Sequence, residues 1–352
     1  MTQRFRLAII GTGLITQGSH LPAALSSDRV EVAALVDSVA DRAASLARSY
    51  GISPRIATDV REVLGDIDGA LIATPNDSHA PIAIACLEAG VPVLIEKPLA
   101  STSAEAERIL AAASRTGSVV AAGYSTRFRP STVLLKELVD REYFGRARRF
   151  VHQFGTPGGW APLSSYNLNR QTAGGGVLVV TATHFIDRML NLFGMPEGVD
   201  FEDDASNGPE ANCTAYFHYG PARHGLEGMA RYSKTTRLPS GMAIEFDRGI
   251  VTLRDSDDAE IVFAPSDGSG YSQVIRTSPA PAAVPDSFLE QIHDFVDACR
   301  NGSRPRVSGQ EGLMSLQLIE RLYAGRKRFS EDWYRDDAAS AEGRFANNRI
   351  AA

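Results

Sequence analysis

The stretch R-L-A-I-I-G-T-G-L-I-T, Arg6 to Thr16, decides the fold. Arg6–Ile10 is a short apolar run typical of a buried strand, and a glycine turn follows it at once. Glycines at such a turn let backbone N–H groups approach a pyrophosphate, which then lies at the N-terminus of the next helix. Thr16 replaces the third glycine of the usual fingerprint. The residues that we expect to bind a dinucleotide here are Gly11, Gly13, Leu14 and Ile15.

A second predicted strand, Val30–Val36, ends at Asp37. An acidic residue at this place accepts hydrogen bonds from both ribose hydroxyls of NAD and repels the 2′-phosphate of NADP. The alternative is that Asp37 caps the helix predicted from Val39 to Tyr50. We predict NAD as the cofactor in preference to NADP.

The strand and helix pattern then repeats. Gly69–Ala73 reads as a strand, a turn follows, and a helix runs from about His79 to Gly90. Because the carboxyl ends of parallel strands share one edge, residues of this turn and helix should lie near the cofactor. The candidates are Thr74, Pro75, Asn76 and His79.

Val91–Ile95 is a third run of this kind, and it ends in Glu96, Lys97 and Pro98. A lysine fixed at a strand end is placed for proton transfer to a bound ligand, although surface lysines are also common there. A further helix to Gly117 and a strand from Ser118 to Ala122 complete the alternation. We predict a doubly wound parallel sheet of the Rossmann type over residues 1–123.

Composition and net charge limit the number of domains and the classes of protein to which the chain could belong. The chain has 352 residues, 43% hydrophobic and 22% charged, which suits two globular domains. A net charge of −6 argues against a nucleic-acid partner, and no apolar run approaches the length of a membrane span. Cys86, Cys213 and Cys299 fit neither a disulfide framework nor a metal site. We expect a cytoplasmic protein without a metal.

From Tyr124 the pattern changes to strands separated by glycine, proline and aspartate turns. Consecutive strands without helices between them predict an open, mostly antiparallel sheet in an α+β domain over residues 124–330. Two helices, Asp286–Arg300 and Ser308–Arg326, and a polar tail over residues 331–352 follow. The predicted strands are 147–154, 211–219, 227–233, 241–246, 249–254 and 259–263.

Five motifs occur in the order seen in the Gfo/Idh/MocA oxidoreductases, which this chain resembles from about Arg6 to Arg326. They are G-T-G-L-I-T, A-T-P-N, E-K-P, G-Y-S-T-R-F-R-P and G-G-G-V-L-V-V-T-A-T-H-F-I-D. The resemblance implies that Lys97 handles a proton and that Glu96 and Lys97 approach nicotinamide and sugar. It also implies that Tyr124 and Arg127 lie near the ligands, and that the sheet pairs subunits into a homodimer or homotetramer.

Two later segments offer substrate contacts. The loop Gly155–Arg170 carries Trp160 and Arg170, which suit sugar stacking and hydrogen bonding, unless Trp160 only anchors the loop. A helix predicted over Gly176–Asn191 aligns Val180, Thr181 and His184 on one face. A histidine on such an apolar helix is usually a core residue, but the resemblance implies that His184 faces a substrate hydroxyl.

Relatives carry an Asp-x-x-x-His pair on this helix, and Val180 stands in place of the aspartate. Thr181 supplies a hydroxyl nearby but no base. We therefore expect Val180 to face an apolar or absent group, as in a deoxy, anhydro or bulky-substituted sugar.

Together these patterns predict an NAD-dependent dehydrogenase or reductase that acts on a CH–OH group of a sugar, cyclitol or sugar derivative. One alternative is an NAD-dependent glycosidase that works by transient oxidation and elimination. Another is a non-catalytic regulator that senses a sugar or a dinucleotide.

Overall fold

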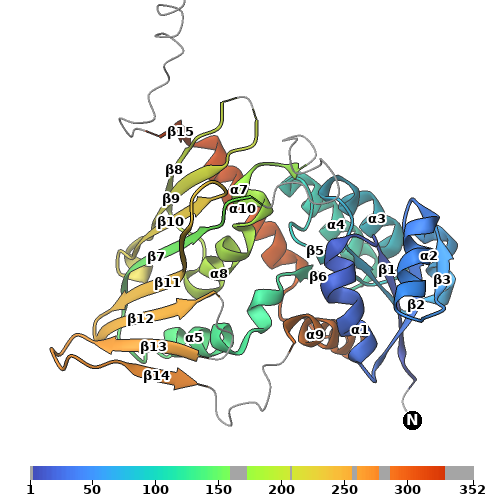
Figure 1. Ribbon diagram of the computed structural model, residues 1–352, viewed down its shortest axis with the longest axis horizontal. Helices are drawn as coiled ribbons and strands as arrows, with labels where there is room; N and C mark the ends of the chain where they lie inside the picture. The colour runs from blue at the N-terminus through green and yellow to red at the C-terminus, as the bar shows by residue number, and fades with distance from the viewer. Residues whose placement is uncertain (1–2, 159–172, 207, 256–259, 277–285, 330–352) are drawn as a thin grey trace, which may run out of the picture.

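The structure is a computed structural model that describes residues 3–158, 173–206, 208–255, 260–276 and 286–329. Two sheets stand side by side, the first with helices on both faces and the second with helices on one face (Figure 1). The predicted residues 331–352, Trp160 and Arg170 lie outside the described residues.

The first sheet is entirely parallel, in the order β3-β2-β1-β4-β5-β6. Each strand is a short apolar run whose alternate side chains enter two different cores. The sequence therefore predicted this half correctly, apart from the three-residue strand β3. Its strands are β1 (Phe5–Ile10), β2 (Val30–Val36), β3 (Arg55–Ala57), β4 (Gly69–Ile72), β5 (Val93–Glu96) and β6 (Val120–Gly123).

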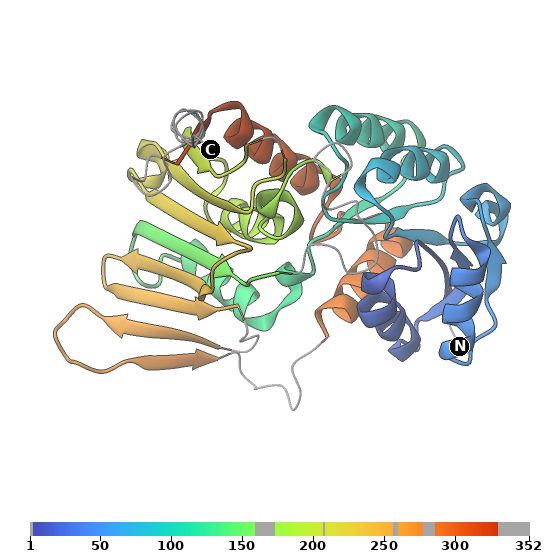
Figure 2. The same cartoon turned by 45° about the horizontal axis from the view of Figure 1, so that its top comes forward.

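Helices cover both faces of this sheet. One core contains residues of α1 (Leu21–Ser26), α2 (Ala40–Ser49) and α9 (Ser287–Asn301). The other contains residues of α3 (Asn76–Glu88), α4 (Ser103–Thr116) and the first half of α10 (Gly309–Ala324). Figure 2 shows α9 beside the N-terminal strands, so the chain returns to its first half after building the second. Short turns here are η1 (Thr16–His20), η2 (Val60–Glu62) and η3 (Leu64–Asp66).

The second sheet has the order β14-β13-β12-β11-β7-β10-β9-β8-β15 within the described residues. Its pairings are antiparallel, except that β7 pairs with β10 and β8 with β15 in parallel. The sequence did not predict β8, β14 and β15. The strands are β7 (Ala147–Gly155), β8 (Gly198–Asp203), β9 (Asn212–His218), β10 (Glu227–Ser233), β11 (Leu238–Phe246), β12 (Gly249–Arg254), β13 (Glu260–Pro265), β14 (Gln273–Arg276) and β15 (Arg326–Arg328).

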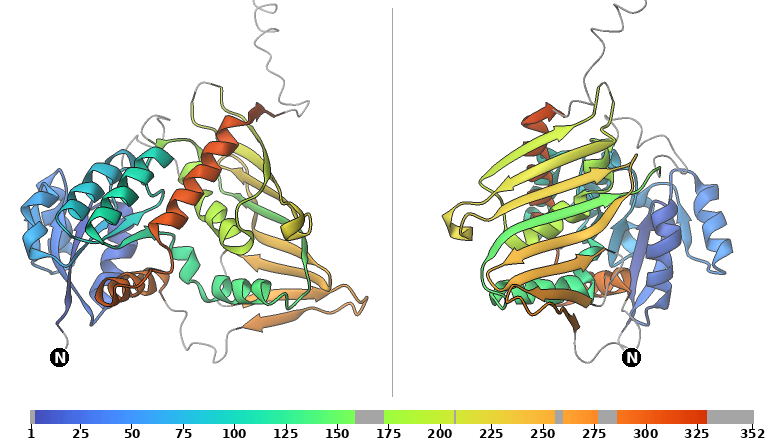
Figure 3. Two further views of the ribbon diagram at one scale, coloured as in Figure 1. Left: turned by 180° about the vertical axis from the view of Figure 1, so that it is seen from behind. Right: turned by 60° about the vertical axis from the view of Figure 1, so that its left-hand side comes forward.

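Helices cover only one face of the second sheet, and the other face is open (Figure 3). The covered face packs on α5 (Pro130–Asp140), α8 (Thr183–Phe193) and the second half of α10. On β9, Cys213, Ala215 and Phe217 are buried in the core while Tyr216 is exposed on the other face. Short turns in this half are η4 (Ser125–Phe128) and η6 (Pro221–Arg223).

The single helix predicted over Gly176–Asn191 is wrong. The chain forms α7 (Val177–Val180) and α8, with a break at Thr181 and Ala182. The carbonyl of Val180, which a continuous helix would offer to residue 184, lies 3.4 Å from Lys97 Nζ instead. A contact across the molecule thus replaces a local helical hydrogen bond.

Among the described residues, no helix is both long enough and apolar enough to cross a bilayer. Cys86 and Cys213 are buried free thiols, and Cys299 is partly buried. Burial raises the pKa of Cys86 and of Cys299 to about 12, so neither is a reactive thiolate near neutral pH.

Candidate active site

A cavity of about 1240 Å³ runs along the carboxyl edge of the first sheet. Parallel sheets bind ligands at this edge. The predicted residues that line it are Gly11, Gly13, Leu14, Ile15, Asp37, Thr74, Pro75, Asn76, Glu96, Lys97 and His184. The cavity therefore brings together residues from the first four predicted strand ends and from α8.

The glycine turn between β1 and η1 has the shape that a dinucleotide requires. Gly11 has a φ of +91°, and a Cβ there would lie 2.5 Å from the Ala73 carbonyl oxygen. A Cβ on Gly13 would meet no atom within 4 Å, so this glycine borders open space. Leu14 and Ile15 are 47% and 39% exposed beside it. Thr16 is buried and its hydroxyl donates to the Gly11 carbonyl, 2.6 Å away. These residues fit a bound pyrophosphate.

Asp37 lies at the end of β2 and lines the cavity, while Val39 is the N-cap of α2. The Asp37 carboxylate accepts a hydrogen bond from Thr12 Oγ1 at 2.6 Å. It also accepts hydrogen bonds from the N–H groups of Thr12 and Val39, at 3.0 and 2.9 Å. Burial alone would raise the pKa of Asp37, but these hydrogen bonds lower it. The group facing the cavity is thus a carboxylate anion, which suits ribose hydroxyls.

The turn after β4 is held from behind by His79. Its Nδ1 and Nε2 each lie 2.9 Å from a carbonyl oxygen, of Pro98 and Thr74 respectively. His79 is fully buried and does not line the cavity, so the predicted cofactor contact is replaced by a tie between two strand ends. Asn76 Nδ2 donates to the Ala173 carbonyl at 3.1 Å, linking this wall to the second half.

Glu96 is buried at the end of β5, and both of its oxygens have protein donors. His20 Nε2 lies 2.8 Å from Oε1, and the N–H of Lys97 donates to Oε2 at 3.0 Å. Burial alone would raise the pKa of Glu96, but the hydrogen bond and the electrostatic interaction with His20, followed by the charge of Lys97, lower it to about 2. Glu96 is therefore a buried anion at the end of the cavity that Lys97 lines.

Lys97 and His184 come from opposite halves of the molecule and meet at this end. Burial lowers the pKa of Lys97, and Glu96 acts in the opposite direction. Burial and the Lys97 charge lower the pKa of His184 to about 3. His184 is therefore neutral near pH 7, and its buried Nδ1 has no hydrogen-bond partner within the described residues. A lysine that loses its proton readily thus lies beside a neutral imidazole.

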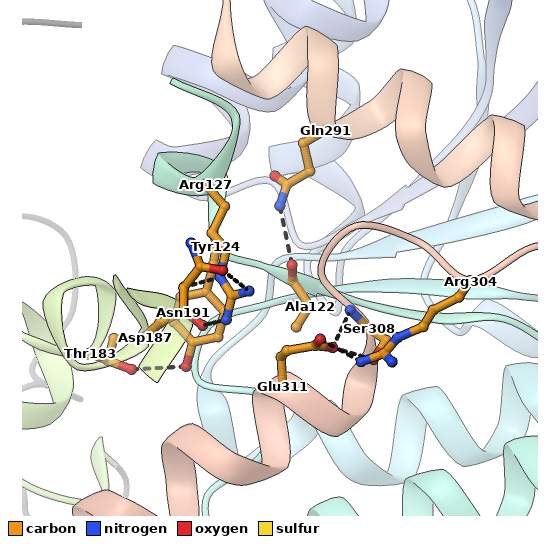
Figure 4. A network of polar contacts seen from close by, with 10 residues as sticks. All are labelled: Ala122, Tyr124, Arg127, Thr183, Asp187, Asn191, Gln291, Arg304, Ser308 and Glu311. Atoms are coloured by element: carbon orange, nitrogen blue, oxygen red, sulfur yellow. Dashed lines mark hydrogen bonds and ion pairs between the residues drawn. The ribbon is translucent and has the colours of Figure 1, made fainter. Parts of the chain in front are cut away.

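Tyr124 and Arg127 are not among the residues that line the cavity, and both contact side chains of α8 (Figure 4). Arg127 Nε and Nη2 donate to the two oxygens of Asp187, both at 2.7 Å, and Nη1 donates to Asn191 Oδ1 at 3.0 Å. The Tyr124 hydroxyl lies 3.1 Å from Thr183 Oγ1. These contacts hold the helix that carries His184, and the ligand contacts of Tyr124 and Arg127 stay a prediction.

Val180 contributes its carbonyl oxygen to Lys97, and neither Val180 nor Thr181 is among the cavity-lining residues. Both are partly buried at the helix break. Sequence reasoning missed His20 and Phe288. Of these two residues, Phe288 lines the cavity. No local pattern marked either residue, since each meets the site only through contacts between distant segments.

Two family models match the chain. The oxidoreductase family with an NAD-binding Rossmann fold matches residues 5–124, and the C-terminal alpha/beta domain of that family matches residues 136–328. The chain is 33% identical to the rhizopine catabolism protein MocA of Rhizobium meliloti over 323 residues, which is 90% of this chain and 93% of that protein. It is 29% identical to 1,5-anhydro-D-fructose reductase of Ensifer adhaerens over 340 residues, covering 88% and 93%.

Two other relatives are matched over only 52% and 64% of their own length. Among solved structures, levoglucosan dehydrogenase in complex with NADH and levoglucosan superposes with a TM-score of 0.81 at 21% identity. That match covers 92% of this chain and 97% of the other, and it shows a common fold. With both family models matched in order, the chain belongs to the Gfo/Idh/MocA family of oxidoreductases, whose N-terminal Rossmann domain binds NAD.

Proposed function

We propose that this protein is an NAD-dependent dehydrogenase or reductase acting on a CH–OH carbon of a sugar, cyclitol or sugar derivative. The observation that carries the proposal is the meeting of Lys97 and His184 in one cavity with the glycine turn and Asp37. Gly11, Gly13 and Asp37 would hold NAD, which supplies the hydride acceptor when bound.

Lys97 takes the hydroxyl proton as the alcohol is oxidised, and returns it in the reverse reaction. A lowered pKa lets a lysine accept a proton near neutral pH, and burial lowers that of Lys97. His184 orients the substrate hydroxyl as a neutral hydrogen-bonding group, because an imidazole with a pKa of about 3 is not an acid near neutral pH.

For the substrate we propose a deoxy, anhydro or substituted sugar. The residue four positions before His184 in the sequence is Val180, which has no carboxylate, and a relative matched over 88% of this chain is named as a 1,5-anhydro-D-fructose reductase. Kinetics on a hexose and its 1,5-anhydro analogue test this point. A strong preference for the free hexose or for inositol would overturn it.

We also propose that the open sheet face joins copies of this chain into a homodimer or homotetramer. Ala243, Val151, Met229 and Tyr216 are neighbours across β11, β7, β10 and β9, and they form an apolar row on the uncovered face. Val151 is 37% exposed and Tyr216 is 36% exposed. Such a row is suited to burial against a second copy.

The experiment that tests the activity is a screen of sugars, anhydro sugars and inositols with NAD and NADP, following the absorbance of the reduced cofactor. We expect turnover with NAD and at least one carbohydrate, and weaker turnover with NADP. Cofactor binding without turnover on any carbohydrate would contradict the proposed activity.

A further inference from the structure

His20 ends η1, and η1 is a π-helical turn. A π-turn holds one residue more than an α-turn, so it rotates the residues after it by roughly 100° relative to an unbroken α-helix. The N–H of Leu21 donates to the Thr16 carbonyl and closes the turn. The turn thereby sets the direction in which the His20 ring leaves the helix, toward the end of β5.

The His20 ring is buried between Glu96 and Phe288. Its Nε2 lies 2.8 Å from Glu96 Oε1, and its edge meets the Phe288 ring at a centroid distance of 5.0 Å and an angle of 90°. His20 Nδ1 is buried and has no partner within the described residues. A carboxylate has no proton to donate, so His20 carries a proton on Nε2 and donates it to Glu96.

His20 and the backbone together occupy both oxygens of Glu96. Oε1 accepts from His20 and Oε2 accepts from the N–H of Lys97. Glu96 and Lys97 are adjacent in sequence, yet their side chains form no ion pair with each other, and Lys97 Nζ contacts the Val180 carbonyl instead. A direct ion pair with Glu96 would favour the protonated form of Lys97 and so raise its pKa.

We propose that His20 is a positioning residue of the active site, whose Nε2–H holds the Glu96 carboxylate back from the Lys97 ammonium so that Lys97 can give up its proton. This inference rests on the proposed function in taking Lys97 as the proton-handling group. His20 itself does not line the cavity and acts only through Glu96.

The other titratable groups that act on this pair come from further elements. They are His79 on α3, His184 on α8 and Lys234 after β10. Burial lowers the pKa of both histidines, so both are neutral near pH 7. Burial and the Lys97 charge lower the pKa of Lys234. Of the three histidines, only His20 donates to the Glu96 carboxylate within the described residues.

Three substitutions along one hydrogen bond test the proposal. His20→Phe keeps the ring volume and removes the donor, His20→Gln places an amide N–H where Nε2 lies, and Glu96→Gln removes the negative charge. The readout is the pH at which the acidic limb of kcat/KM for alcohol oxidation rises, because Lys97 must be neutral to accept the hydroxyl proton.

We expect His20→Phe to move this limb to higher pH by about one unit, because the released carboxylate then pairs with the ammonium. Glu96→Gln moves it to lower pH, and His20→Gln leaves it near the wild-type value. In the double variant His20→Phe/Glu96→Gln, we expect the acidic limb at the same pH as in Glu96→Gln. A limb that stays in place in His20→Phe, or moves to lower pH, overturns the proposal.

A second measurement needs neither substrate nor cofactor. The rate at which acetic anhydride labels Lys97, read by peptide mass spectrometry from pH 6 to pH 11, reports the same proton equilibrium in the resting protein. If no carbohydrate is turned over, the proposed function fails while this titration still decides the role of His20. His20→Asn, whose amide does not reach Glu96, replaces His20→Phe if the latter does not fold, and we expect the same shift.

Discussion

Lys97 is a single residue whose chemistry depends on burial, on its sequence neighbour Glu96 and on the backbone of a distant segment at Val180. Burial lowers its pKa, the Glu96 anion opposes that change, and the Val180 carbonyl contacts its Nζ at 3.4 Å. None of these influences by itself makes Lys97 a base. Together these influences give a lysine with a lowered pKa. It lies at the end of the cavity where both halves of the molecule contribute side chains.

Replacing Lys97 by alanine should lower kcat/KM by roughly 10²–10⁴-fold, the usual value of positioned acid–base help. The dissociation constant of NAD, measured by titration, should change little, because the glycine turn and Asp37 are untouched. Lys136→Ala is the control, since Lys136 pairs with Asp140 on α5 and does not line the cavity. Near wild-type turnover in Lys97→Ala would exclude the proposed role.

Asp37→Ala should weaken NAD binding and reduce the discrimination against NADP. The carboxylate lines the cavity at the end of β2, and its anionic form suits ribose hydroxyls but repels a 2′-phosphate. Binding of both dinucleotides by fluorescence titration measures the ratio. Asp41→Ala, an exposed neighbour on α2 that does not line the cavity, should leave the ratio unchanged. A wild-type preference for NADP would show the assignment to be wrong.

The residues that sequence could predict are those whose signal is local. A glycine turn, Asp37 and the Glu96–Lys97 pair each follow directly after an apolar strand, so a parallel sheet is enough to bring them together. His20 is 76 positions from Glu96, and Arg127 is 60 positions from Asp187. Such pairs depend on the relative placement of whole elements, and no short pattern specifies that placement.

At the scale of elements, the break between α7 and α8 is fixed by contacts on both sides. The buried Glu210 accepts from the N–H groups of Gly176 and Leu178, both at 3.0 Å, and so caps α7. The Val180 carbonyl at the other end faces Lys97. The apolar period over this segment fits one long helix equally well, which explains why sequence alone predicted one.

Short or polar strands also escaped prediction. β15 is only Arg-Lys-Arg and pairs in parallel with β8, and β14 is an exposed edge strand of four residues. Neither has the alternation that marks a half-buried strand. The strands that the sequence did predict in this half all contribute buried side chains to its core.

The contacts of Asp255, directly after β12, with α8 and β7 predict a dependence of stability on pH. Arg188 Nη1 lies 2.6 Å from Asp255 Oδ1, and His152 Nε2 lies 3.3 Å from Oδ2. Burial alone would raise the pKa of Asp255, but His152 and Arg188 lower it to about 2. A lowered pKa in the folded state stabilises the protein above the unfolded pKa, and this contribution is lost as pH falls toward 2.

Asp255→Asn should therefore show a smaller loss of Tm than wild type between about pH 4 and pH 2, where this carboxylate accounts for about 2 kcal/mol. It should also be less stable at pH 7, by about 3–5 kcal/mol, because Arg188 stays buried without its partner charge. Glu107→Gln, on the exposed side of α4, serves as the control. Parallel Tm profiles for wild type and Asp255→Asn would contradict the pairing.

For the whole molecule, α9 and α10 decide how the two halves meet. α9 packs in the core of the first sheet, while α10 contributes to the cores of both sheets. Sequence predicted the two helices and gave no way to choose which sheet each would join, since an amphipathic pattern does not identify its partner. The hydrogen bond from Asn76 Nδ2 to the Ala173 carbonyl adds a buried link between the halves.

The open face of the second sheet leads to the prediction for the assembly. The row from Ala243 to Tyr216 crosses four strands, and Ile250 on β12 is 46% exposed beside it. A two-fold interface places the same patch on both subunits, so one substitution introduces two charges into it. The double variant Val151→Asp/Tyr216→Asp should therefore dissociate far more readily than wild type.

Sedimentation velocity measures this outcome: wild type should move as a dimer or tetramer of 37.8 kDa chains, and the double variant as a monomer. Leu25→Asp is the matched control, because Leu25 is 39% exposed on α1, away from the sheet. That variant should keep the wild-type mass. A monomeric wild type, or a double variant that keeps the wild-type mass, would show that this face does not join subunits. Because neither Val151 nor Tyr216 is among the residues that line the cavity, the dissociated variant should still bind NAD.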